Sequence, residues 1–207
     1  NICQFFDPEF MFSQTGFDIV IGNPPYLLIS KELYNKLYSK FYLLQEGKPD
    51  LFRIFCEMAQ NNLRNKGVFA FIIPNTILTI PNAKKLRKNY LEKHKILSII
   101  NFDDSVFQNA SVNSIVLITS KNKDEIEGNE VSISAYTTVN DLKKGNFNTT
   151  FQNSFQKNEK FEFNIFTTDH DSKLLSKISM KSCNISDMDI EVTLGIQPYH
   201  NTLHSEK

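Results

Sequence analysis

The stretch Phe17–Tyr26, with the sequence FDIVIGNPPY, decides the fold class of this chain. Its first six residues, Phe17–Gly22, form a short apolar run rich in β-branched side chains, which is typical of a buried strand in a parallel sheet. The loop Asn23–Tyr26 follows directly, and its two prolines have a fixed φ and no backbone N–H. We therefore expect a strand that ends at Gly22, with a stiff loop at its carboxyl end.

Downstream of this loop, helical and strand patterns alternate. Asp50 is a good N-cap for the clearest helix, and Lys66-Gly67 is expected to end that helix. We predict helices over Ser30–Leu44, Leu51–Asn65, Asn82–Lys93 and Leu174–Met180, and strands over Val68–Ile73, Lys95–Phe102, Ser114–Thr119 and Val131–Val139. Strands that alternate with helices indicate βαβ units and a mostly parallel sheet. The loop before Ser114 is too short for a helical crossover, so the strands that flank it should form an antiparallel hairpin. The predicted fold class is α/β with a mixed sheet.

Composition and charge narrow the class of protein. The 207 residues carry 23 Lys+Arg and 23 Asp+Glu, and 41% hydrophobic residues with 18 Phe indicate a folded globule. The zero net charge gives no strongly basic domain, although one basic face can be balanced elsewhere. No apolar run approaches the ~18 residues of a membrane span, and no signal peptide is visible, so a cytoplasmic protein without a membrane partner is expected.

The cysteines and the ends of the chain add two expectations. Cys3, Cys56 and Cys183 are odd in number and far apart, which favours buried free thiols over disulfides or a zinc site. The chain begins at Asn1 without Met and stops in a polar stretch, so we expect it to be a piece of a longer protein. After Lys121 the sequence becomes polar and Asn-rich, and we place a domain boundary near residue 140, between residues 1–140 and 141–207.

The tetrad Asn23-Pro24-Pro25-Tyr26 carries the candidate chemistry. Asn23 and Pro24 each precede a proline and are therefore held extended. The loop lies at the carboxyl end of a parallel strand, where open α/β sheets bind ligands. It offers the Asn23 side-chain oxygen, the Pro24 carbonyl and the flat face of Tyr26. Two fixed acceptors would bind both hydrogens of an exocyclic ring amine and free its lone pair for attack, while the aromatic face would stack on the ring. The alternative is a rigid turn with no ligand.

The chain resembles the gamma class of N6-adenine DNA methyltransferases from bacterial restriction-modification systems, which includes TaqI-like and type IIG enzymes. Beside FDIVIGNPPY, several stretches match family motifs in order. They are PDLFRIFCEMAQNNLRNKGVFAFIIPN at 49–75, KKLRKNYLEKHKILSIINF at 84–102, VFQNASVNSIVLITSK at 106–121 and GIQPYH at 195–200. The resemblance runs from about Phe5 to Lys121 and returns near Gly195.

The resemblance implies a function and a site. It implies a Rossmann-like fold, S-adenosylmethionine as cofactor, double-stranded DNA as partner, and methyl transfer to a flipped adenine held by Asn23, Pro24, Pro25 and Tyr26. Phe107 would contact the base from its other side. Asp7 is the candidate contact for the cofactor, and an equally good alignment places Gln4 at that position.

The resemblance also bears on the domains. It makes residues 1–140 the later part of the catalytic domain, without the glycine-rich cofactor loop that lies upstream in the family. Residues 141–207 would be a linker and the start of the DNA target-recognition region. It is compatible with fused nuclease and target-recognition domains, although the sequence does not show whether a nuclease is fused. It further implies an isolated chain that is inactive and exposes a sheet edge prone to self-association.

Other readings stay open. Protein-glutamine and RNA N-methyltransferases also use Asn-Pro-Pro-Tyr, and a non-catalytic DNA-binding module is a third alternative. Asp50 and Glu57 are interpreted as a helix cap and a surface charge, and His200 and His204 lack the further ligands of a metal site. The basic run could contact phosphates, although a solvated helix face is the simpler interpretation; it comprises Lys84, Lys85, Arg87, Lys88, Lys93 and Lys95.

Overall fold

The computed structural model describes residues 8–102, 113–136, 141, 145, 147–157, 160–166, 169–183 and 187–190. Its helices are α1 (Pro8–Phe12), α2 (Lys31–Leu37), α3 (Leu51–Asn62), α4 (Lys84–Lys93) and α6 (Asp169–Ser179). Its strands are β1 (Phe17–Gly22), β2 (Leu63–Pro74), β3 (Lys95–Phe102), β4 (Ser114–Ser120), β5 (Glu130–Tyr136) and β6 (Asn148–Phe151). Short 3-10 turns lie at Asn75–Leu78, Pro81–Ala83, Lys123–Glu125 and Gln152–Lys157.

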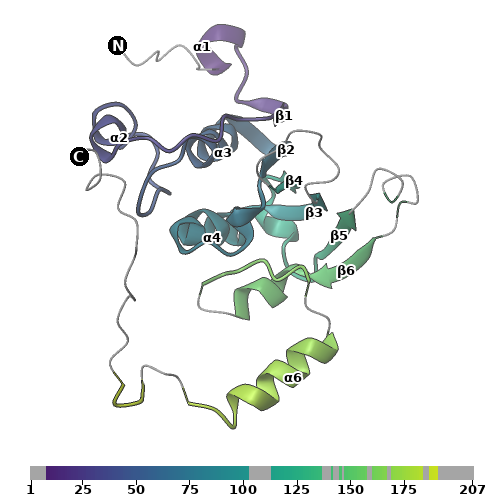
Figure 1. The fold of residues 1–207 in the computed structure, drawn as a ribbon. Coiled ribbons are helices and arrows are strands. Elements are labelled where there is room, and N and C mark those ends of the chain that lie inside the picture. Colours follow the sequence, from purple (N-terminus) through teal and green to yellow (C-terminus); the bar gives the residue numbers. More distant parts are fainter. Residues whose placement is uncertain are drawn as a thin grey trace, which may run out of the picture. The chain divides into compact units, whose positions relative to one another are not determined.

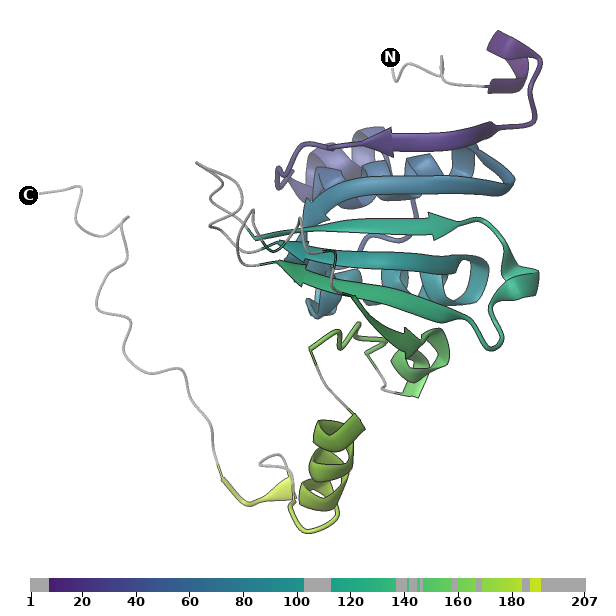
Figure 2. The ribbon, with the colours of Figure 1, turned by 90° about the vertical axis from the view of Figure 1, so that its right-hand side faces the viewer.

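The six strands form one mixed sheet in the order β1-β2-β4-β3-β5-β6. β1 pairs parallel with β2 and β3 with β5, whereas β4 runs antiparallel to both β2 and β3. Figure 2 shows β4 pointing against its neighbours in the sheet. The predicted α/β class and the antiparallel hairpin of β3 and β4 are confirmed.

One edge of the sheet gathers the ends of several strands. Ser114, the first residue of β4, pairs with Pro74 at the end of β2 and with Phe102 at the end of β3. Because β1 runs parallel to β2, the loop after Gly22 reaches this same edge. The sheet therefore places the candidate loop beside the end of β2 and the start of β4.

The hydrophobic core lies between the sheet and the helices. Side chains alternate along β2, with Phe69, Phe71 and Ile73 buried and packed in one cluster with Phe52 and Cys56 of α3 and with α4. Figures 1 and 2 show α3 and α4 on the same face of the sheet. The period of two along β2 is what one covered sheet face requires.

β1 has the predicted bounds, but the prediction that it is a buried strand is wrong. Ile19 and Ile21 are 65% and 78% exposed, because β1 is the first strand of the sheet order and pairs only with β2 among the described strands. An apolar run indicates a strand that is covered on both faces, but it does not show which segment of the protein covers it.

Two predicted helices are shorter than their patterns. α2 ends at Leu37 and not at Leu44, since the chain turns at Tyr38 and the Tyr34 hydroxyl donates to the Tyr42 carbonyl at 2.5 Å. α3 ends at Asn62, because Lys121 Nζ donates to the carbonyls of Gln60 and Leu63 and so satisfies the last turn. β2 begins directly afterwards.

The chain divides into two compact units, Asn1–Ile165 and Phe166–Lys207. β6 pairs with β5, so the first unit continues beyond residue 140. The functional assignment of 1–140 to catalysis and 141–207 to a linker and DNA recognition stays a prediction. In the part of the chain that the structure describes, no helix is long and apolar enough to cross a membrane.

Candidate active site

The Asn23–Tyr26 loop leaves β1 at the edge where β2 ends. Asn23 and Pro25 are exposed, whereas Pro24 is buried. Within the described residues, the Asn23 side chain has no hydrogen-bond partner and no backbone N–H bonds to the Pro24 carbonyl. The loop therefore presents two oxygen acceptors that the described fold does not use.

Tyr26 is fixed beside these acceptors. Its hydroxyl donates to the Ile72 carbonyl of β2 at 3.1 Å, and its ring packs edge-on against Phe52 with ring centroids 6.3 Å apart. Partial burial raises the pKa of Tyr26, and a hydrogen bond with Ser114 opposes the rise. The Tyr26 side chain is thus held by β2, α3 and β4, while the residue stays 38% exposed. No sequence pattern marks Ile72 or Ser114 as partners of this ring, because the pairing of β2 with β4 brings them there.

The far end of the loop is bound to the start of α3. Leu28 forms an antiparallel bridge with Asp50, in which the Ile29 N–H donates to Pro49 O at 3.0 Å and the Leu51 N–H donates to Leu27 O at 2.9 Å. Asp50 caps α3 as predicted, accepting from the Phe52 N–H at 3.3 Å. The candidate loop and the first turn of α3 are one hydrogen-bonded unit.

The interpretation of Glu57 as a surface charge is wrong. Glu57 is 6% exposed, and its carboxylate accepts the N–H groups of Leu43 and Leu44 at 2.6 and 2.9 Å. Burial raises its pKa, and these hydrogen bonds oppose the rise. Glu57 therefore holds the chain between α2 and α3, and the helical spacing alone does not reveal that a loop folds back over this position.

Arg87 departs from the phosphate-contact and solvated-face interpretations of the basic run. It is fully buried, and its guanidinium donates to the carbonyls of Phe161, Ile77, Ile80 and Lys160 at 2.8–2.9 Å. The exposed side chains of Lys84 and Lys88 lie over the Phe161 ring. Four carbonyl acceptors occupy Arg87, so this arginine joins chain segments and is not available to phosphates.

The thiols divide by position. Cys56 is buried, and burial raises its pKa to about 12, so it is an unreactive core thiol. The prediction of burial is wrong for Cys183, which is exposed in a polar stretch after α6.

Cys3, Asp7, Phe107, His200 and His204 lie outside the described residues. Within the described residues, no group of three or more His, Cys, Asp or Glu could hold a metal ion.

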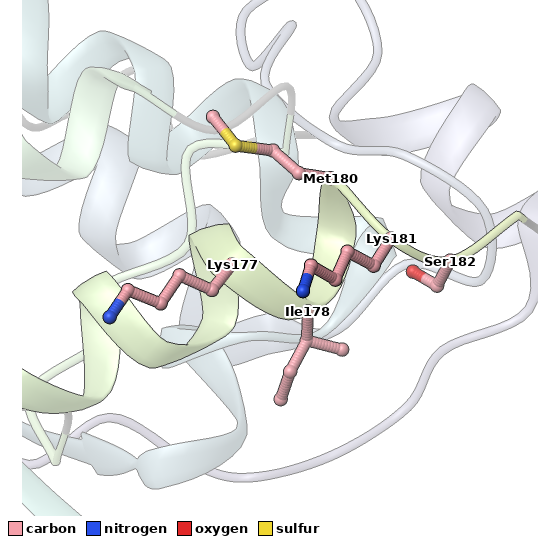
Figure 3. Close-up of a pocket in the computed structure, with 5 residues that line it drawn as sticks. All are labelled: Lys177, Ile178, Met180, Lys181 and Ser182. Carbon is pink, nitrogen blue, oxygen red and sulfur yellow. The ribbon is translucent and has the colours of Figure 1, made fainter.

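A hollow of about 660 Å³ lies at the carboxyl end of α6, within the second unit. Figure 3 shows its lining side chains pointing in different directions around the end of the helix; they are Lys177, Ile178, Met180, Lys181 and Ser182. None of the predicted site residues that the structure describes lines this hollow.

Comparison with known proteins places the chain in a family. Residues 3–107 match the family model described as Eco57I restriction-modification methylase. The type II restriction enzyme and methyltransferase RM.Eco57I of Escherichia coli is 32% identical over 114 residues, which cover 51% of this chain and 11% of the relative. The type II methyltransferase M.PstI of Providencia stuartii is 25% identical over 181 residues, which cover 84% of this chain and 35% of the relative. The chain spans only a small part of the length of these relatives.

A solved structure supports the fold. The type IIG restriction endonuclease BpuSI matches with a TM-score of 0.58 and 14% identity, over 82% of this chain and 22% of that chain. The predicted resemblance thus agrees with the comparisons in both sequence and fold. Since the family model covers just over half of the residues, the chain belongs to the Eco57I restriction-modification methylase family.

Proposed function

We propose that the full-length protein containing this chain is a site-specific DNA adenine-N6 methyltransferase of a restriction-modification system. The observation that carries this proposal is the exposed Asn23 amide, which has no partner among the described residues and stands beside the fixed ring of Tyr26. Family membership supports the reaction class, and the free acceptors support an amine as the group acted upon.

The chain would present the adenine amine for attack. The Asn23 side-chain oxygen and the Pro24 carbonyl would accept the two N6 hydrogens, which favours a pyramidal nitrogen with an available lone pair. S-adenosylmethionine, when bound, supplies an already activated methyl group on a sulfonium centre. Asn23 and Pro24 would hold N6 with its lone pair directed toward the methyl donor, and N6 would release one proton to solvent once it carries the methyl group. No side chain of this loop needs to act as a general base.

The described residues fit the half of this reaction that binds the methyl-accepting amine. Asn23, Pro24 and Tyr26 offer oxygen acceptors and an aromatic face to a planar amine. We assign no described residue to the cofactor, and Asp7 remains the proposed contact with it. The chain's own part in the reaction is therefore to bind and orient the base.

Double-stranded DNA is the proposed partner. An adenine inside a duplex cannot offer N6 to this loop, so the base must be extruded at a cost of a few kcal/mol. Stacking on Tyr26, and on Phe107 as proposed from the resemblance, would return about 1–3 kcal/mol per contact. Residues 141–207 would begin the region that recognises the DNA sequence. The proposed location of the protein is the cytoplasm.

The complete gene, expressed in a host without adenine methylation, tests this function. We expect N6-methyladenine at one recurrent sequence in the host DNA, and its loss in the Asn23→Ala variant. Asn65→Ala is a matched control, since Asn65 is also exposed but lies near the opposite end of β2. Unmethylated DNA in cells that contain soluble protein would reject the proposal and favour an RNA or protein substrate or a binding role.

A further inference from the structure

We propose that Asp50 is a positioning residue for the candidate active site, and that it sets the place of Asn23 and Tyr26 through the backbone of Leu27. This inference rests on the proposed function and deepens it. Asp50 would contact neither the base nor the cofactor. It would act by joining the loop to the rigid start of α3.

The contacts of Asp50 go in two directions. Toward its own helix, the carboxylate accepts the Phe52 N–H at 3.3 Å and so caps α3. Toward the candidate loop, the N–H of Leu51, in the turn that Asp50 caps, donates to the Leu27 carbonyl at 2.9 Å. Burial raises the pKa of Asp50, and hydrogen bonding from the backbone, that of Leu27 included, opposes the rise. The adjacent bridge between Leu28 and Asp50 holds the two backbones in register. One half-buried side chain thus links the residue after Tyr26 to the first turn of α3.

The position of Leu27 affects Asn23 and Tyr26 because the backbone between these residues has few free rotations. Leu27 directly follows Tyr26, whose hydroxyl and ring are held by Ile72 and Phe52. Pro24 and Pro25 have fixed φ angles, so they transmit the position of Tyr26 to Asn23 with few available rotations. Phe52, which touches the Tyr26 ring, is itself ordered by the Asp50 cap. Loss of the Asp50 carboxylate would therefore free the loop at Leu27 and would also loosen the packing of Phe52 against the Tyr26 ring.

Ser30 provides a matched control. It caps α2 by accepting from the Leu33 N–H at 3.1 Å, and it lies three residues after Leu27. Ser30→Ala removes an N-cap from a neighbouring helix, just as Asp50→Ala does, but leaves Leu27 and Tyr26 untouched. A merely structural role for Asp50 predicts that the two variants behave alike once both are folded.

The test uses the full-length protein with radiolabelled S-adenosylmethionine and unmethylated bacterial DNA. We expect Asp50→Ala to lower kcat about 10- to 100-fold, the scale at which a misplacement near 1 Å affects catalysis. The KM for S-adenosylmethionine should change little, and Ser30→Ala should keep a kcat within about 2-fold of wild type, since it leaves the reacting groups in place. Asp50→Asn keeps an equally good N-cap with one acceptor oxygen, so its kcat should lie between those of wild type and Asp50→Ala.

A second readout does not depend on activity. Hydrogen exchange at the amides of residues 27–29 should speed up in Asp50→Ala and stay slow in Ser30→Ala. Wild-type kcat and wild-type exchange in folded Asp50→Ala would overturn the proposal, and if that variant does not fold, the same result in Asp50→Asn would overturn it. A wild-type protein that does not methylate the DNA would instead reject the proposed function itself, and the positioning role with it.

Discussion

His94 shows how one buried side chain couples this fold to pH. It follows α4, is 2% exposed, and packs its ring edge-on against Tyr90 with centroids 5.4 Å apart. Burial, together with the nearby cations Lys121 and Lys93, lowers its pKa to about 4. The neutral ring is therefore the form that this part of the core accepts.

We predict that His94 makes the protein less stable in mild acid. Below pH 6.5 the unfolded chain binds a proton at His94, while the folded chain does not until about pH 4. The free energy of unfolding should thus be unaffected by His94 above pH 6.5 and should fall as the pH drops from 6.5 toward 4. Urea unfolding should show that the wild type loses about 2 kcal/mol more than His94→Gln between pH 7 and pH 5. Equal losses in the two proteins would contradict the assignment.

At the scale of elements, sequence patterns succeed where a run of strand-forming residues has clear ends, even when the strand is partly exposed. The bounds of β1 and β3 agree with the prediction, because each run is rich in β-branched and aromatic side chains and is bounded by polar or Gly residues. The pattern over Ser30–Leu44 fails beyond Leu37, because the chain turns at Tyr38. Glu57 holds the segment that follows α2, and Lys121 binds the last carbonyls of α3; both act from distant positions in the sequence.

The same reasoning applies to the candidate site. A sequence-level argument finds the Asn23–Tyr26 loop because prolines and a strand end are local features. It does not find Ser114, Ile72 or the loop contact of Asp50, since these depend on how β4 and α3 pack against the loop. The acceptors are thus predictable from sequence, and the groups that orient them follow only from tertiary structure.

Arg87 gives a prediction that separates a structural role from a DNA contact. Arg87→Lys keeps the charge but loses the planar fork that reaches four carbonyls, so it should lower the free energy of unfolding by about 2–3 kcal/mol. Lys85→Ala, which removes an exposed charge of the same helix, should change it by less than about 0.5 kcal/mol. Thermal or urea unfolding of both variants provides the measurement. Unchanged stability in Arg87→Lys, with weaker DNA binding, would instead support a phosphate contact.

At the scale of the whole molecule, the described sheet has two edges of unequal character. β1 carries the exposed Ile19 and Ile21 over six residues, while β6 at the other end of the strand order has four residues. An edge strand presents unpaired N–H and C=O groups, and an apolar edge is a template for pairing with another chain. In the family to which this chain belongs, the relatives are much longer than the match, so the chain expressed alone lacks whatever else those relatives contain.

We therefore predict that the 207-residue chain, expressed alone, self-associates through β1. Light scattering should report a mass above the 23.9 kDa of one chain, and the excess should grow with protein concentration. Ile21→Lys places a charge on the edge and should shift the population toward monomers, because charged edge residues oppose strand pairing. Phe151→Lys at β6 is the matched control and should have little effect, since that edge is shorter and its neighbouring residues are polar. A wild-type chain that stays monomeric, or an association removed by Phe151→Lys and not by Ile21→Lys, would show that β1 is not the adhesive edge.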